Sequence, residues 1–197
     1  MMSPKRVDKP ARRQEILEAA VRVFARRGFA ASRIEDVAAE AEIAKGSVYL
    51  YFDSREEILH AAFEALAAGS REIVGRARTT QAPPLERLAG LIRDVITSVT
   101  VSPELARLLL DLYGSGAREE GLPLHMAEIY REYRTAIAAL LAEAVAEGSA
   151  RQGVGVAEAT VIVGAIEGCL LQWIIDPALP INELAGPIAA LCVSGVR

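Results

Sequence analysis

A short run of cationic, small and hydroxyl-bearing residues has the chemistry needed to contact DNA. It reads Lys45-Gly46-Ser47-Val48-Tyr49-Leu50-Tyr51-Phe52. Glycine and serine leave room for close approach to base edges or phosphates, and tyrosine hydroxyls hydrogen bond to phosphate oxygens. Val48 and Phe52 have the spacing to face a core. We therefore predict DNA contacts from the other six residues of the run, with core packing as the alternative for the tyrosines.

Two arginines outside this run stand where helices are expected to begin. Arg33 precedes one apolar-periodic segment and Arg55 precedes a longer one. A cation beside the unpaired backbone N–H groups of a helix N-terminus is suited to holding a phosphate. We therefore add Arg33 and Arg55 to the predicted DNA-binding residues.

The charge of the chain is distributed unevenly. The formal net charge is −4, but residues 1–33 hold nine basic and three acidic side chains, so residues 34–197 sum to −10. A positive end is where a polyanion docks. A solvated basic helix is the alternative, so charge alone does not establish nucleic-acid binding.

Apolar residues repeat at helical spacing through most of the chain and predict an all-α fold of about nine helices. Expected helices at 10–27, 33–41 and 45–52, with a three-residue turn between the last two, have the spacing of a helix-turn-helix over about 33–52. Ser32 with Glu35 and Ser54 with Glu57 form expected capping boxes, and Gly28 and Gly148 are expected to end helices. Further helices are expected at 55–78, 85–101, 103–114, 122–147, 156–176 and 181–196.

These elements divide the chain into two expected domains. Residues 1–54 form a small helix-turn-helix domain, and residues 55–197 form a helical domain for ligand sensing and dimerisation. The long helix that starts at Arg55 joins the two.

The span from Arg13 to Leu59 resembles the N-terminal signature of the TetR (tetracycline repressor) family of transcriptional regulators. The resemblance rests on Ile16-Leu17-Glu18-Ala19-Ala20, Phe24, Gly28-Phe29, the segment 32–41 and the run from Lys45 to Leu59. It implies a homodimeric repressor that binds double-stranded DNA at a palindromic operator and leaves it when a small-molecule effector binds. It also implies DNA contacts at Ser47, Tyr49 and Tyr51, and sequence choice at Lys45 and Leu50.

Three residues depart from the family pattern. Glu42 stands at a turn position where the family usually has glycine, which predicts backbone strain if φ is positive there. Arg55 replaces the more usual lysine and keeps the charge. Leu50 replaces a commonly polar residue, so we expect an apolar contact, for example with a thymine methyl group.

The last two expected helices are the candidates for a dimer interface, because small residues four apart permit close helix approach. The predicted interface residues are Val161, Gly164, Ala165, Gly168, Leu171, Ile188 and Leu191. The alternative is that these faces pack within one chain. The segment 154–175 carries Glu158, Glu167 and Gln172, so we interpret it as a buried helix rather than a membrane span.

A ligand pocket is harder to locate, because the chain has no cofactor motif. Amphipathic aromatic and apolar residues suggest a mostly apolar pocket and a hydrophobic effector. The candidate lining residues are Leu108, Leu112, Tyr113, Tyr130, Tyr133, Glu167 and Trp173. Ordinary core packing is the alternative for each of them.

Other function classes have weaker support. The two histidines, His60 and His125, have no nucleophile or metal partner in the pattern, so we expect no catalytic residue, metal or cofactor. Cys169 and Cys192 are expected to be reduced and buried. No secretion signal is indicated, so we expect a cytoplasmic protein. The competing hypothesis is a helical protein-interaction module that never binds DNA.

Overall fold

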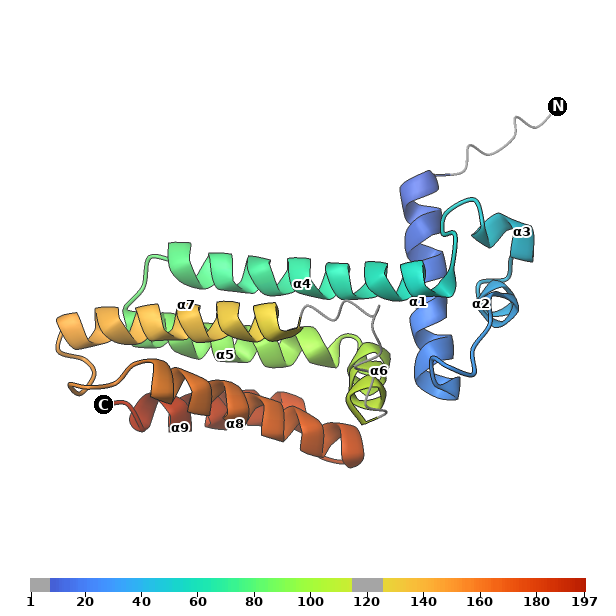
Figure 1. Cartoon of the computed structure of the whole chain (residues 1–197). Helices are drawn as coiled ribbons and strands as arrows, with labels where there is room; N and C mark the ends of the chain where they lie inside the picture. The colour runs from blue at the N-terminus through green and yellow to red at the C-terminus, as the bar shows by residue number, and fades with distance from the viewer. Residues whose placement is uncertain (1–7, 115–125) are drawn as a thin grey trace. The chain divides into compact units, whose positions relative to one another are not determined.

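A computed structural model of the chain describes residues 8–114 and 126–197, without the side chains of residues 112–114. Every regular element in these ranges is an α-helix, as predicted (Figure 1). The helices are α1 (Lys9–Arg27), α2 (Ile34–Glu40), α3 (Lys45–Val48), α4 (Arg55–Thr79), α5 (Pro84–Thr100), α6 (Pro103–Gly114), α7 (Met126–Ala146), α8 (Val156–Ile175) and α9 (Ile181–Ser194). The first four residues of the expected helix 122–147 lie outside the described residues.

The chain forms two compact units that divide inside α4. The N-terminal unit comprises 1–65 and 104–123, and the C-terminal unit comprises 66–103 and 124–197. The N-terminal unit therefore holds the helix-turn-helix, the first part of α4 and almost all of α6, whereas we expected a single boundary after residue 54. The two units share α4 as a continuous element.

Local signals set most of the helix ends. The Asp8 carboxylate accepts a hydrogen bond from Ala11 N–H at 3.3 Å and caps α1, and Gly28 ends it with φ of 77°. Gly148, also with positive φ, follows α7. A left-handed residue after a helix is readily supplied by glycine.

The first expected capping box is wrong by one residue. Arg33 precedes α2, and the Asp36 carboxylate accepts its N–H at 2.9 Å. Ser32 is buried instead, and its hydroxyl donates to the Gly28 carbonyl at 2.7 Å. A cap pattern identifies candidate oxygens, but the path of the loop decides which one reaches the N–H groups.

The second expected box is present in a shifted form. Glu57 N–H donates to the Ser54 hydroxyl at 3.1 Å, as a cap requires. The Glu57 carboxylate accepts from Asp53 N–H at 2.6 Å rather than from Ser54. Both contacts anchor the start of α4 to the turn that follows α3.

The helix predicted over residues 45–52 is shorter than expected, because α3 ends at Val48. Beyond it the chain continues in tight turns, with Tyr51 N–H donating to the Val48 carbonyl at 2.9 Å. Gly46 and Ser47 have weak helix propensity, and one turn contributes little stability alone. Packing of Val48 and Phe52, which are 0% and 1% exposed, holds this segment in place.

The N-terminal unit has its own apolar core. The rings of Phe24 and Phe29 meet edge to face, with centroids 5.1 Å apart. Ile16 of α1, Val37 of α2 and Ile58 of α4 are each fully buried in the same unit. Edge-to-face pairs stabilise a core beyond the area they bury, so the short helices are held by tertiary packing.

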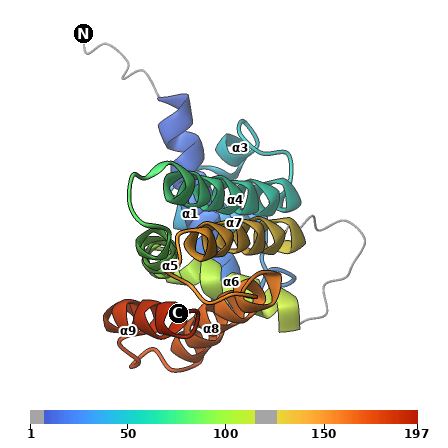
Figure 2. The same cartoon turned by 90° about the vertical axis from the view of Figure 1, so that its left-hand side faces the viewer.

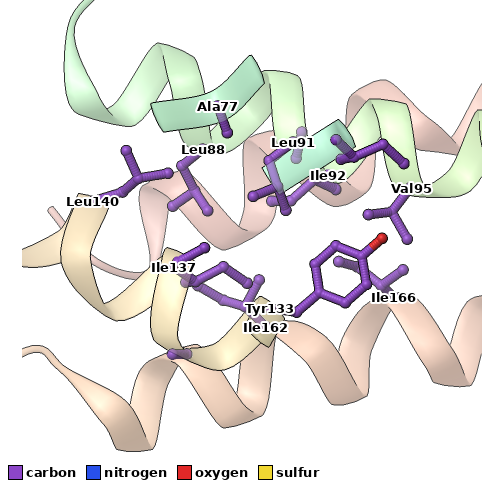
Figure 3. Close-up of a cluster of buried hydrophobic side chains, with 14 of the residues drawn as sticks. Ala77, Leu88, Leu91, Ile92, Val95, Tyr133, Ile137, Leu140, Ile162 and Ile166 are labelled. Atoms are coloured by element: carbon purple, nitrogen blue, oxygen red, sulfur yellow. The ribbon is translucent and has the colours of Figure 1, made fainter. Parts of the chain in front are cut away.

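The C-terminal unit is a helical bundle in which α5 packs on α7, α8 and α9 (Figure 2). Leu88, Leu91 and Ile92 of α5 meet Ile137 of α7 and Ile162 of α8 in its core (Figure 3). This bundle buries Ala159, Ile162 and Ile166 of α8, but no other described residue covers the opposite face of this helix.

Candidate nucleic-acid interface

The turn between α2 and α3 contains a strained residue at the expected position. Glu42 has φ of 55°, and it is the one non-glycine residue in the described ranges with positive φ. Its N–H and that of Ile43 donate to the carbonyls of Ala39 and Ala38, at 3.2 and 3.0 Å, which closes the end of α2. A side chain in this left-handed region costs free energy that glycine avoids.

The segment after this turn presents the predicted residues outward. Leu50 is 79% exposed and Tyr49 is 46% exposed, whereas Ser47 and Tyr51 are half-buried. A Cβ atom added at Gly46 would meet nothing within 4 Å. Packing within the described residues therefore does not require glycine there, and the close approach to DNA remains a prediction.

Lys45 does not stand alone on this surface. Its ammonium lies 2.6 Å from Glu35 Oε1 of α2 and 5.9 Å from the centre of the Tyr49 ring. The hydrogen bond to Glu35 raises the pKa of Lys45, and the same bond lowers the pKa of Glu35. Both groups are therefore ionised at neutral pH.

Arg33 is exposed, and its guanidinium has no hydrogen-bond or ion-pair partner within the described residues. The backbone N–H of Arg33 donates a hydrogen bond to the Asp36 carboxylate. The free backbone group that we expected beside the guanidinium is therefore not available. A phosphate role for Arg33 therefore rests on its side chain.

Arg55 has a structural role that the sequence did not reveal. Its Nη1 donates to the carbonyls of Phe29, Ala30 and Ser32 at 3.0, 3.1 and 2.8 Å. The guanidinium also lies 4.7 Å from the centre of the Phe29 ring. These contacts bind the start of α4 to the loop between α1 and α2, so Nη1 is not available for the phosphate contact that we predicted.

Several other cations are paired inside the N-terminal unit. Glu40 accepts hydrogen bonds from Arg22 at 2.9 Å and Arg26 at 2.7 Å, and Asp36 pairs with Arg27. The partners are 9 to 18 residues apart in sequence, so helical spacing could not identify them. The positive field estimated from the sequence is correspondingly reduced.

The predicted pocket residues do not form one group within either unit. Leu108 is buried in the N-terminal unit, whereas Tyr130, Tyr133, Glu167 and Trp173 belong to the C-terminal unit. The side chains of Leu112 and Tyr113 lie outside the described residues.

Two of the predicted pocket residues are tyrosines with polar partners on other helices. The Tyr130 hydroxyl donates to the Glu167 carboxylate, which joins α7 to α8. Tyr133 is 9% exposed; burial raises its pKa, while a hydrogen bond with Ser70 lowers it. Tyr133 and Ser70 are thus polar groups buried inside an apolar bundle, whereas the contact of Tyr130 with Glu167 lies at the surface.

One groove opens on the surface of the C-terminal unit, between α5 and α9. Its volume is about 260 Å³, and Leu85, Ala89, Arg93, Ala189 and Val193 are among its lining residues. Drug-sized ligands occupy clefts of roughly 300–1,000 Å³, so this groove is small for an effector. None of the predicted pocket residues lines it.

The predicted dimer-interface residues differ in how exposed they are in the single chain. Val161 and Leu191 are 71% and 73% exposed, and Gly164, Ala165 and Leu171 are exposed as well. Gly168 is half-buried. Ile188 is buried in the core of its own chain, so its assignment to a surface is wrong. An apolar pattern shows that a face is buried, but not whether its partner lies in the same chain.

The expectation that α8 is buried is also wrong. Within its most apolar window only 22% of the residues are buried. By length and composition α8 would qualify as a membrane span, alone among the helices in the described ranges. Val156 and Ile175, near the two ends of α8, are also exposed, at 68% and 70%.

Within residues 8–114 and 126–197 no group of three acidic, histidine or cysteine side chains could hold a metal ion. Cys169 and Cys192 are free and half-buried, and burial raises the pKa of Cys192. A raised pKa disfavours the reactive thiolate. His125 lies outside the described residues.

Two family profiles cover most of the chain. The profile described as "Bacterial regulatory proteins, tetR family" matches residues 16–62. The profile described as "BetI-type transcriptional repressor, C-terminal" matches residues 84–188, more than half of the chain.

Individual proteins agree with these profiles. The fatty acid metabolism regulator protein of Bacillus subtilis (strain 168) is 28% identical over 188 residues, 93% of this chain and 94% of that protein. The repressor KstR2 of Rhodococcus jostii (strain RHA1) is 30% identical over 152 residues, 75% of this chain and 72% of KstR2. The crystal structure of FadR from Bacillus subtilis in complex with stearoyl-CoA has a TM-score of 0.74 and 26% identity, covering 93% of this chain and 99% of FadR.

Proposed function

Because this chain belongs to the TetR family of bacterial transcriptional regulators, and is a DNA-binding repressor rather than an enzyme, we propose that it binds a palindromic operator as a homodimer and is released by a hydrophobic effector. Membership of this family also excludes the alternative of a protein-interaction module that never binds DNA. The operator, the dimer and the effector class are the new elements of the proposal.

The outward-facing segment 45–51 supports the assignment of the operator contacts. Gly46, Tyr49 and Leu50 are exposed, while Val48 and Phe52 hold the segment on the core. In a helix-turn-helix the second helix enters the major groove, where its first residues reach base edges. We assign base-edge contacts to Lys45 and Leu50, and phosphate contacts to Arg33, Ser47, Tyr49 and Tyr51.

The uncovered apolar face of α8 and α9 supports the homodimer. Val161, Leu171 and Leu191 together with Gly164 and Ala165 expose apolar and small side chains to water. Contiguous exposed apolar surface on a protein that is not in a membrane marks an interaction site. Two copies of a recognition helix about one helical turn of DNA apart then match a palindrome.

Similarity to FadR over nearly the whole chain is the observation that carries the effector class. FadR is crystallised with stearoyl-CoA, and its identity to this chain extends beyond the DNA-binding region. A long acyl chain gains about 0.8 kcal/mol for each CH₂ group that it buries. We propose a long-chain acyl-CoA thioester as the effector, bound through the C-terminal unit.

The shared helix α4 offers the route from effector to DNA. Its first turn carries Arg55, which is bonded to the loop between α1 and α2, and its later part packs in the C-terminal unit. An effector that binds better to the state in which the dimer does not fit the operator shifts the population toward release. A repressor of this kind works where the bacterial chromosome lies, so we place it in the cytoplasm.

Selection of bound duplexes from a random DNA library, repeated over a salt series, tests the operator. Enrichment of a palindrome, with affinity that falls steeply as salt rises, is the expected result. Enrichment of a single half-site without symmetry would overturn the dimeric operator.

The selected duplex then serves to test the effector. We expect stearoyl-CoA to release the protein, while free CoA and free stearate at equal concentration do so weakly or not at all. If all three leave the complex intact, the acyl-CoA proposal is wrong although the operator stands.

A further inference from the structure

The ion pair between Glu35 and Lys45 lies at the start of both helices of the helix-turn-helix. Glu35 is in the first turn of α2 and Lys45 is the first residue of α3. Their side chains are 57% and 50% exposed, and their charged atoms lie 2.6 Å apart. The pair therefore includes one of the residues to which we assign the operator contacts, Lys45.

This ion pair is exchangeable. An exposed pair contributes little to stability, because water and salt screen it. Lysine carries a compact charge on a flexible stem, so its ammonium can leave a carboxylate for a nearby phosphate. Glu35 and a DNA phosphate are thus competing anions for one cation.

We infer that Glu35 is a specificity-determining residue: it competes with DNA phosphates for the ammonium of Lys45 and so weakens binding to non-operator DNA more than binding to the operator. This inference rests on the DNA-binding function of the chain and not on the identity of the effector.

Lys45 forms different contacts in a complex with non-specific DNA and in a complex with the operator. Non-specific binding depends almost entirely on phosphate contacts, so moving Lys45 from Glu35 to a phosphate exchanges one anion for another with little gain. In the operator, the first residues of the recognition helix meet base edges, where lysine donates to guanine O6 and N7. That contact forms only in register with the right base, and it compensates for the loss of Glu35.

Neighbouring groups also act on the two members of this ion pair. After Lys45, the charge of Arg33 also lowers the pKa of Glu35, so the carboxylate is ionised in the free protein at neutral pH. The pKa of Lys45 is raised first by its hydrogen bond with Glu35 and by the charge of Glu35, and then by Tyr49. Glu35 is therefore the main electrostatic partner that DNA must displace.

The test uses the full-length protein with Glu35→Gln, Lys45→Met and the double substitution. Fluorescence anisotropy measures binding to a duplex of mixed sequence and to the selected operator over a potassium chloride series. For the mixed-sequence duplex we expect Glu35→Gln to steepen the slope of log K against log salt by about 0.9, one additional phosphate contact. At about 0.1 M salt this corresponds to roughly five- to tenfold tighter binding, while operator affinity changes less, so the ratio of the two affinities falls.

Two control variants show whether the effect of Glu35→Gln depends on Lys45. In the Lys45→Met background, Glu35→Gln should leave the slope unchanged, because no ammonium remains to be released. Glu42→Gln removes one exposed charge from the neighbouring turn without touching the pair, and should also leave the slope unchanged. A steeper slope in either control, or no change with Glu35→Gln alone, overturns the inference. If no palindromic operator is found, the mixed-sequence slope still decides whether Glu35 competes with phosphates for Lys45, and an unchanged slope still overturns the inference.

Discussion

Arg55 donates from Nη1 to the Ser32 carbonyl at 2.8 Å, across 23 positions of sequence. The carbonyls of Phe29 and Ala30 accept from the same nitrogen, and the guanidinium stacks on the Phe29 ring. A single side chain at the first residue of α4 therefore satisfies the main chain of the loop that precedes α2. This contact connects the orientation of the helix-turn-helix to the long helix.

Replacing Arg55 with alanine should destabilise the N-terminal unit. Hydrogen bonds to a charged group contribute about 1.5–3 kcal/mol. The carbonyls of Ala30 and Ser32 lose the Arg55 donor, while that of Phe29 keeps the N–H of Ser32, so we expect a loss of about 2 kcal/mol. Urea unfolding followed by far-ultraviolet circular dichroism measures it. Arg71→Ala, at an exposed position of α4, is the matched control and should cost little. Equal losses in both variants would show that the contacts of Arg55 contribute nothing specific.

Glu42→Gly should stabilise the protein. Relief of the left-handed conformation is worth about 1–2 kcal/mol, and the greater freedom of glycine in the unfolded chain offsets about half of it. We therefore expect a gain of about 0.5–1 kcal/mol in urea unfolding. Glu42→Ala keeps the Cβ atom and should show no gain. If alanine and glycine stabilise equally, strain at φ of 55° is not the cause.

Glu40 should make folding sensitive to acid. Hydrogen bonds from Arg26 and Arg22 lower the pKa of its carboxyl below the ordinary value of 4.5. Because the pKa is lower in the folded state, the ionised Glu40 carboxylate contributes fully to stability above pH 4.5. This contribution to the free energy of unfolding is lost as pH falls through the folded-state pKa.

The measurement is urea unfolding at neutral pH and at several values below pH 4.5. Glu40→Gln should cost about 0.5–1 kcal/mol at neutral pH, because the ion pairs are partly screened, and should lose less stability than wild type on acidification. Glu72→Gln, an exposed carboxylate of α4, is the control. Parallel acid curves for wild type and Glu40→Gln would contradict the prediction.

Arg33→Ala should weaken binding to operator and non-operator DNA alike. A side chain that contacts phosphate carries no sequence information, so its loss lowers the magnitude of the salt slope by about 0.9. Tyr49→Phe should weaken binding through loss of one hydroxyl without changing that slope. Arg93→Ala in the C-terminal unit is the control. An unchanged slope in Arg33→Ala would remove the phosphate role.

Val161→Asp and Leu191→Asp should separate the proposed dimer. Both side chains are more than 70% exposed in the single chain, so a carboxylate costs little there but is strongly unfavourable in an apolar interface. Light scattering during size-exclusion chromatography measures the mass. Ala142→Asp, at an exposed position of α7, should leave the mass unchanged. A constant mass in all three variants would place the interface elsewhere.

The sequence by itself determined the features that depend on near neighbours. The 3.6-residue period located the helices, and Gly28 and Gly148 marked helix ends. The strained turn residue Glu42 was identified through the resemblance to the TetR family, which usually has glycine there. Val48 and Phe52 were correctly placed in the core. These features follow from backbone sterics and from residues three or four apart, which are legible in a linear chain.

Only the tertiary structure decided which distant groups meet. Arg55 contacts carbonyls at 23 to 26 positions before it, and Lys45 meets Glu35 across a turn. Ile188 is buried within its own chain, while only a minority of the residues in α8 are buried. An amphipathic period indicates that one face of a helix is covered, and a charged side chain often needs a partner. Neither pattern identifies which residue is the partner. The folding of the loops selects it, because loops bring together residues that no local rule relates.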